Sequence, residues 1–114
     1  MTTHISHHIL LCATPRKAKC CESKLGSATW DRLKSLINEL NLEDPRRPEG
    51  IVLRSKVDCL RVCEKGPILL IWPDGIWYAE VTPYRLEKII KDHIIKGLPK
   101  EDWIIKKTPQ NLSN

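Results

Sequence analysis

The chain has 114 residues, the size of one domain, and 41% of them are hydrophobic, so a core can hold the fold without disulfides. No apolar run reaches the roughly 18 residues of a membrane span, and the start MTTHISHHILLC lacks the pattern of a signal peptide. We therefore expect no membrane span and a cytoplasmic location, where thiols stay reduced. The net charge of +5 favours an acidic partner.

The first half of the chain predicts a strand and a helix. The apolar run HHILLC, residues 7–12, reads as a buried strand that ends at Cys12, and a polar loop follows it. The next apolar residues recur at helical spacing, at Trp30, Leu33, Ile37 and Leu40. Ser27 is the predicted N-cap, and the stretch NLEDPRRPEG ends the helix because its two prolines and glycine cannot continue it.

The second half predicts three strands and a second helix. The run IVLRSKVDC, residues 51–59, reads as a strand, and two further β-rich runs flank a PDG turn in which Gly75 takes a positive φ. Thr82 is the predicted N-cap of the second helix, Pro83 its first residue and Gly97 its stop. Its apolar face consists of Leu86, Ile89, Ile90 and Ile94.

The element order β-α-β-β-β-α predicts an α/β fold with a thioredoxin-like layout. A crossover helix would join the first two strands, and a hairpin and a covering helix would complete a four-stranded mixed sheet with two main helices. We expect residues 1–97 to form this domain. Residues 98–114 read as a basic C-terminal tail whose only apolar anchor is Trp103, Ile104 and Ile105.

Five cysteines stand out in so short a chain, at Cys12, Cys20, Cys21, Cys59 and Cys63. In the cytoplasm such a cluster indicates metal binding or catalysis more often than disulfides, and the odd count argues against complete pairing. Four thiolates from two loops suit a zinc ion or a [2Fe-2S] cluster. The spacing, C-x7-CC and C-x3-C, is wider than that of zinc knuckles and lacks the runs of plant-type and bacterial ferredoxins. These spacings favour an iron–sulfur cluster, and a zinc site and thiol redox chemistry remain as alternatives.

Three stretches carry a resemblance to a known family: HILLC, CCESKLGS, and CLRVCEKGPILLIWPDGIWYAEVTP. The last is the most specific, because it combines C-x3-C, Gly-Pro, an apolar strand, Pro-Asp-Gly and Trp-Tyr. Together they resemble the thioredoxin-like, Shethna-type [2Fe-2S] ferredoxins, which are related to the small peripheral iron–sulfur subunit of respiratory complex I. The stretch LLCATPRKAKCC resembles the cyanobacterial branch most closely.

The resemblance implies a one-electron carrier, not an enzyme, with a [2Fe-2S] cluster held by four cysteines. Cys12, Cys59 and Cys63 correspond directly to family ligands. The family has one cysteine where this chain has Cys20 and Cys21, and we expect Cys21, nearer the glycine of the first helix, to be the fourth ligand. A homodimer is also implied by the resemblance.

Basic residues surround the predicted ligands. Arg16, Lys17 and Lys19 lie in the first cysteine-bearing loop, and Lys56, Arg61 and Lys65 flank the second cysteine pair. Positive charge favours the reduced, more negative cluster, so we predict a raised potential and a redox partner with an acidic docking face. The alternative is that these are solvated loop charges.

Other residues and functions carry weaker signals. His7 and His8 point to opposite faces of a strand, so joint metal binding is not expected, and neither is a ligand role for His4. We expect His93 on a helix surface and the WPDGIWY aromatics in packing.

Two alternative functions remain. One is a zinc- or cluster-bearing regulatory or redox-sensing module; nucleic-acid binding is not favoured, because Lys and Arg are dispersed along the chain. The other is a dithiol–disulfide oxidoreductase, which would lack the usual C-x-x-C motif.

Overall fold

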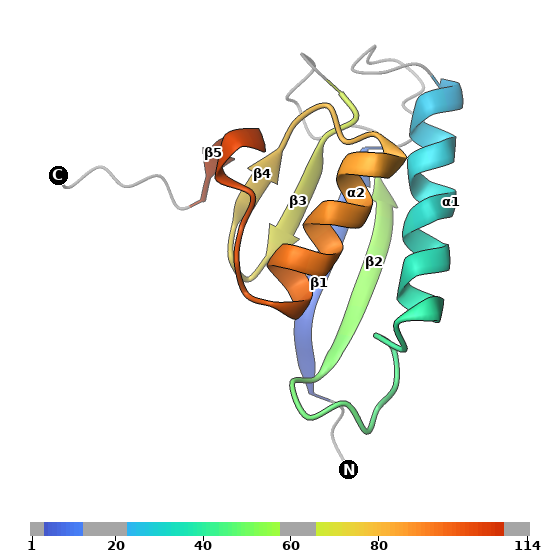
Figure 1. The fold of residues 1–114 in the computed structure, drawn as a ribbon, viewed down its shortest axis with the longest axis vertical. Coiled ribbons are helices and arrows are strands. Elements are labelled where there is room, and N and C mark those ends of the chain that lie inside the picture. Colours follow the sequence, from blue (N-terminus) through green and yellow to red (C-terminus); the bar gives the residue numbers. More distant parts are fainter. Residues whose placement is uncertain (1–3, 13–22, 58–65, 109–114) are drawn as a thin grey trace, which may run out of the picture.

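The structure, a computed structural model, describes residues 4–12, 23–57 and 66–108. These residues form a five-stranded mixed sheet with two main helices, in an α/β arrangement (Figure 1). None of the helices in the described part of the chain is long and apolar enough to cross a membrane.

The sheet has the strand order β2-β1-β3-β4-β5. Its strands are β1 (Ile5–Cys12), β2 (Ile51–Val57), β3 (Leu69–Trp72), β4 (Ile76–Tyr78) and β5 (Ile104–Lys107). Strands β1 and β2 are parallel, and the other neighbours are antiparallel. The mixed sheet is confirmed, but it has five strands instead of four, because the chain after Gly97 returns and adds β5 beside β4.

Helix α1 (Ser23–Glu39) begins four residues before the N-cap predicted at Ser27, so that prediction is wrong. Among the helix residues whose burial is described, Gly26, Thr29 and Leu33 are buried. The apolar periodicity did not reveal this first turn, because Gly26 has no side chain and Thr29 is polar.

Helix α2 (Pro83–Ile89) starts as predicted. The Thr82 hydroxyl accepts a hydrogen bond from the backbone N–H of Arg85, and Pro83 is the first helical residue. The helix continues as a π-helical segment, η1 (Ile90–Ile95), and stops at Gly97, whose φ is +73°. A short 3-10 turn, η2 (Glu101–Trp103), precedes β5.

Both main helices pack on the same face of the sheet. Leu33 and Ile37 of α1 and Leu86 of α2 share one buried core with Ile9 and Ile71 of the sheet. On the opposite face, Cys12, Ile68 and Ala79 form a smaller cluster, with Val57 and Trp77 against it. No helix of the described chain covers that second face (Figure 1).

The predicted hairpin joins β3 to β4. Gly75 has a φ of +69°, and its N–H donates to the carbonyl of Ile71 at 2.7 Å. Across the hairpin, Leu69 pairs with Tyr78 and Ile71 with Ile76, so residues of both strands alternate between the two faces of the sheet.

Candidate metal centre

Cys12 lies at the end of β1, where the sequence predicted it. Its side chain is buried, with 1% of its surface exposed, and it packs with Ile68 and Ala79. Its backbone N–H donates to the carbonyl of Ile68 at 3.0 Å, which ties the end of β1 to the segment that enters β3. The position of this cysteine is therefore set by the sheet itself.

Both ends of the second cysteine-bearing segment lie beside Cys12. In the parallel pairing of β1 and β2, Cys12 is opposite Val57, the last residue of β2. The next described residue is Gly66, two residues before Ile68, whose carbonyl accepts the backbone N–H of Cys12. Cys59 follows Val57 by two residues and Cys63 precedes Gly66 by three, so chain length allows both to reach the end of β1.

The start of α1 is tied to the same end of the molecule (Figure 1). The hydroxyl of Thr29 donates to the carbonyl of Val81 at 2.7 Å, and the N–H of Val81 donates to the carbonyl of Pro67 at 3.0 Å. Cys21 precedes the first residue of α1 by two positions. The fold thus anchors the described residues that flank both cysteine-bearing segments at one end of the sheet, and a donor set of thiols suits a metal centre with sulfur ligands.

Most of the predicted site lies outside the described residues. This applies to the ligand candidates Cys20, Cys21, Cys59 and Cys63, and to Arg16, Lys17, Lys19, Arg61 and Lys65. Of the predicted basic residues, Lys56 is described: it is exposed on β2, with its Nζ 5.9 Å from the centre of the Trp30 ring. Within the described residues, no three His, Cys, Asp or Glu side chains are grouped to hold a metal ion.

The histidines of β1 point to opposite faces, as predicted. His7 Nε2 lies 3.7 Å from the Asp74 carboxylate, and His8 Nε2 lies 2.8 Å from the Ser55 hydroxyl. Burial lowers the pKa of His7, and the nearby Asp74 carboxylate opposes that effect.

His93 was predicted on the helix surface, and this prediction is wrong. The side chain is only 2% exposed, and its Nε2 hydrogen-bonds to the Asp74 carboxylate. Its Nδ1 lies 2.7 Å from the hydroxyl of Tyr78, which also accepts the backbone N–H of Lys100 at 3.0 Å. The helical spacing from Ile89 was the signal that could have placed His93 on the buried face.

The hydrogen-bond partners assign the protons of this network. The Asp74 carboxylate can only accept, so Nε2 of His93 carries a proton and donates it to Asp74. In a neutral His93, Nδ1 then accepts from the Tyr78 O–H, and the Tyr78 oxygen also accepts the N–H of Lys100. Burial raises the pKa of Tyr78 to about 12, so its hydroxyl keeps its proton.

Two of the three aromatic residues of WPDGIWY, Tyr78 and Trp77, serve packing, as expected. Tyr78 is fully buried in the main core. Trp77 is half-buried on the opposite face, and its Nε1 donates to the Thr108 hydroxyl at 2.7 Å.

Comparison with known proteins identifies the family. The chain is 30% identical over 95 residues to a 2Fe-2S ferredoxin of Clostridium pasteurianum, covering 80% of this chain and 87% of that protein. It is 37% identical over 49 residues to a 2Fe-2S ferredoxin of Aquifex aeolicus, covering 43% of this chain and 44% of that one. No protein-family model matches the chain.

A solved structure agrees in fold. The crystal structure of the wild-type thioredoxin-like [2Fe-2S] ferredoxin from Aquifex aeolicus superposes with a TM-score of 0.74 at 23% identity, covering 91% of this chain and all of that one. The fold is therefore thioredoxin-like. With the identity to the clostridial protein along most of both chains, this places the chain in the thioredoxin-like [2Fe-2S] ferredoxin family.

Proposed function

We propose that the protein is a one-electron carrier, not an enzyme, and that Cys12, Cys21, Cys59 and Cys63 bind a [2Fe-2S] cluster. The observation that carries this proposal is the 30% identity to the clostridial ferredoxin over 95 residues. The anchoring of both cysteine-bearing segments beside Cys12 supports it.

The residues around Cys12 fit such a ligand. The hydrogen bond to Ile68 fixes the cysteine backbone, and Ile68, Ala79 and Val57 provide apolar contacts that keep water from the sulfur. When bound there, a cluster would accept and release one electron at a time. A ligand whose backbone is held by the sheet would need little reorganisation during electron transfer.

The fourth ligand is Cys21 in this proposal. Cys21 is one residue nearer than Cys20 to the start of α1, which the fold anchors at the same end as Cys12. The remaining thiol of Cys20 is then a small apolar side chain, the usual fate of a cysteine outside a site.

The proposed partner is a redox protein with an acidic docking face, and the proposed location is the cytoplasm. The net charge of +5 and the basic residues next to the predicted ligands support an acidic partner. The relation to the cyanobacterial branch, which the LLCATPRKAKCC stretch supports, belongs to the same proposal. So does the relation to the complex I subunit, which the family resemblance implies.

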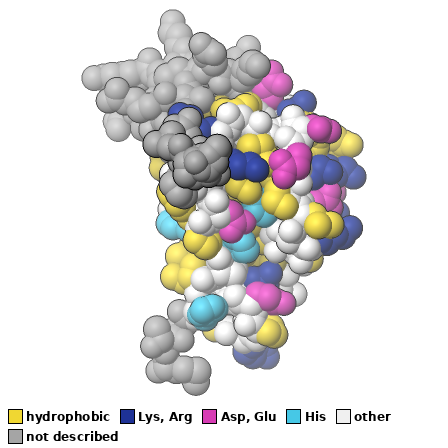
Figure 2. Space-filling model, turned by 90° about the vertical axis from the view of Figure 1, so that its left-hand side faces the viewer, with side chains coloured by type: hydrophobic (Ala, Val, Ile, Leu, Met, Phe, Trp, Pro, Cys, Tyr) yellow, Lys and Arg dark blue, Asp and Glu magenta, His cyan; other side chains and the backbone are white. Residues whose placement is uncertain are grey.

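The protein would form a homodimer through the sheet face that no described helix covers. This face carries mostly uncharged side chains, with Leu10, Leu53, Leu70, Trp72 and Trp77 among them, and Lys106 lies at its edge beside Trp77. Hydrophobic side chains gather on the left-hand side of Figure 2, away from the Lys, Arg, Asp and Glu side chains on the right. A two-fold interface places a patch against itself, so a mostly uncharged patch meets its copy with less repulsion than two basic surfaces would. The test is sedimentation velocity of the wild type and of Leu10→Glu. We expect the wild type to sediment as a dimer and Leu10→Glu as a monomer. A wild type that sediments as a monomer would contradict the proposed dimer.

The cluster proposal is tested by the visible spectrum and by the iron and acid-labile sulfide content of protein purified without oxygen. We expect about two irons and two sulfides per chain and bleaching by dithionite. Cys21→Ser is expected to alter the spectrum and Cys20→Ser to leave it unchanged. A colourless protein with zinc or no metal would overturn the proposal.

A further inference from the structure

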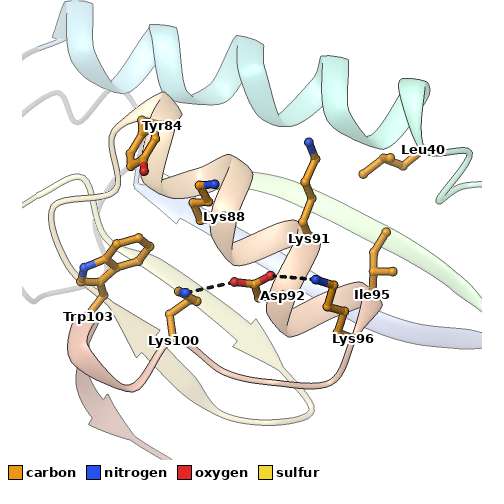
Figure 3. Close-up of a pocket in the computed structure, with 9 residues that line it drawn as sticks. All are labelled: Leu40, Tyr84, Lys88, Lys91, Asp92, Ile95, Lys96, Lys100 and Trp103. Atoms are coloured by element: carbon orange, nitrogen blue, oxygen red, sulfur yellow. Dashed lines mark hydrogen bonds and ion pairs between the residues drawn. The ribbon is translucent and has the colours of Figure 1, made fainter.

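A groove lies between the end of α1, the α2–η1 helix and the chain that leads into β5 (Figure 3). Its volume is about 590 Å³. We call it the lysine groove and define it by its nine lining residues: Leu40, Tyr84, Lys88, Lys91, Asp92, Ile95, Lys96, Lys100 and Trp103.

The groove exposes apolar surface on three elements. Leu40 comes from the end of α1, Tyr84 and Ile95 from the α2–η1 helix, and Trp103 from η2 (Figure 3). Tyr84 is 68% exposed and Ile95 48% exposed, which is high for side chains of this kind. Apolar side chains from three elements around one hollow provide a place for an apolar anchor of a partner.

The charge of the groove is strongly positive, with four lysines against one aspartate. Asp92 pairs with Lys100 at 3.0 Å and with Lys96 at 3.8 Å, and the hydrogen bond from Lys100 lowers the pKa of Asp92, so this carboxylate stays ionised. Lys91 pairs with Glu87, outside the groove, at 2.9 Å. None of the ion pairs among the described residues joins Lys88 to a carboxylate, and its Nζ lies 5.6 Å from the centre of the exposed Tyr84 ring. The unmatched positive charge is therefore centred on α2.

We propose that the lysine groove is a docking site for an acidic segment of a partner protein, with carboxylates on either side of an apolar or aromatic side chain. The apolar anchor would sit between Tyr84, Leu40 and Ile95, and the carboxylates would bind the lysines. Charge complementarity supports this occupant, because an acidic segment supplies partners for Lys88 and its neighbours.

A nucleic acid fits the groove less well than an acidic peptide. Single-stranded nucleic acids need open aromatic faces for stacking, but the Trp103 ring is already contacted by cations, with Arg85 at 4.8 Å and Lys100 at 5.4 Å from its centre. Asp92 also lies inside the groove and would repel a continuous phosphate backbone, whereas separate carboxylates can avoid it.

The site is independent of the proposed metal centre. None of its residues is a predicted ligand, and the α2–η1 helix runs from the end where Val81 meets Pro67 toward the opposite end of the sheet (Figure 1).

The test is peptide display from a random library of short peptides against the protein purified without oxygen. We expect selected peptides to carry several Asp or Glu residues around a Leu, Phe or Trp, and to weaken steeply with added salt. With the best synthetic peptide, Lys88→Glu is expected to raise the Kd about tenfold or more. The matched control is Lys34→Glu, the same charge change at an exposed residue of α1 that does not line the groove; it should leave the Kd within about twofold.

Three outcomes would overturn the proposal. They are selected peptides that are neutral or basic, equal weakening by Lys88→Glu and Lys34→Glu, and a poly-dT oligonucleotide that binds more tightly than the peptide with the same sensitivity to Lys88→Glu. Circular dichroism verifies that each variant folds. The visible spectrum of the same samples reports the metal centre separately, so failure of one proposal is not read as failure of the other.

Discussion

Tyr78 is the residue that links three parts of the chain through buried polar groups. Its oxygen contacts His93 of the η1 segment and the N–H of Lys100, and His93 binds Asp74 in the hairpin turn. Without the hydroxyl, the N–H of Lys100 loses its hydrogen-bond acceptor and Nδ1 of His93 loses its hydrogen-bond partner. We expect Tyr78→Phe to lower the free energy of unfolding by about 1–3 kcal/mol, measured by urea denaturation.

The matched control for this change is Tyr84→Phe. Tyr84 is 68% exposed, so water can hydrate its hydroxyl in both the folded and unfolded states. We expect a change of no more than about 0.5 kcal/mol. Equal effects of the two substitutions would show that the Tyr78 network adds no stability.

His7 makes the stability of the fold depend on pH. Its burial lowers its pKa from 6.5, so the unfolded chain binds this proton more readily than the folded chain does. The contribution of His7 to stability is therefore complete above pH 6.5 and is lost as the pH falls below that value. We expect His7→Gln to lose less stability than wild type between pH 7.5 and pH 5.5. An NMR titration midpoint for His7 at or above 6.5 would contradict this explanation.

The sequence predicted some of these residues and missed others for a physical reason. The end of β1 at Cys12 followed from an apolar run closed by a polar loop, and it is confirmed. His93 was missed because a histidine on a helix is usually exposed, while its burial depends on Asp74 and Tyr78 from the distant hairpin. Partners that come from another element cannot be read from local periodicity.

At the scale of elements, the β3–β4 turn fixes where the fifth strand ends. A Cβ added at Gly75 would lie 1.8 Å from the carbonyl oxygen of Thr108, and Gly75 also has a φ of +69°. The Gly75 carbonyl in turn accepts the N–H of Thr108 at 2.6 Å. We expect Gly75→Ala to cost more than about 3 kcal/mol in urea denaturation and to speed hydrogen exchange at Thr108.

Gly97 gives the matched comparison for this turn. Its φ of +73° is similar, but a Cβ there would meet no atom within 4 Å. Gly97→Ala therefore carries only the backbone strain, about 1–2 kcal/mol. If both alanine variants lose the same stability, the contact between the turn and Thr108 contributes nothing.

Elements with a local chemical signal were predicted well. Thr82 and Pro83 begin α2 because a hydroxyl cap and a fixed φ act within one turn, and Gly75 forms the hairpin for a similarly local reason. The start of α1 was misplaced because Gly26 and Thr29, which are buried near its beginning, do not look apolar. Thr29 is buried because its hydroxyl binds the carbonyl of Val81, a contact that only the tertiary fold supplies.

At the scale of the whole molecule, the order of elements predicted the thioredoxin-like fold, and the family resemblance implied the [2Fe-2S] function. The strand order explains why the described residues that flank two distant cysteine-bearing segments lie close together: β1 and β2 are parallel neighbours, and β3 returns on the other side of β1. The choice between Cys20 and Cys21 stays a prediction, because both lie between the same two anchors, Cys12 and the start of α1.

The fifth strand lies beyond the domain boundary that the sequence predicted at Gly97. Local pattern could not predict it, because β5 has only four residues and three of them are exposed. Yet Trp103 and Ile104 pack against the main core, the N–H of Ala79 donates to the Trp103 carbonyl at 3.2 Å, and Lys100 donates to Tyr78. These contacts join the segment after Gly97 to the sheet.

We therefore expect truncation after Gly97 to lower the free energy of unfolding by at least about 3 kcal/mol, because it removes apolar packing and leaves Tyr78 and β4 without their partners. The measurement is urea denaturation, in which the midpoint is expected to fall. The control is truncation after Thr108, which keeps every residue of β5 and should retain the full-length midpoint. If the chain ending at Gly97 unfolds at the full-length midpoint, residues 1–97 are a self-sufficient domain and the fifth strand is an addition without stabilising effect.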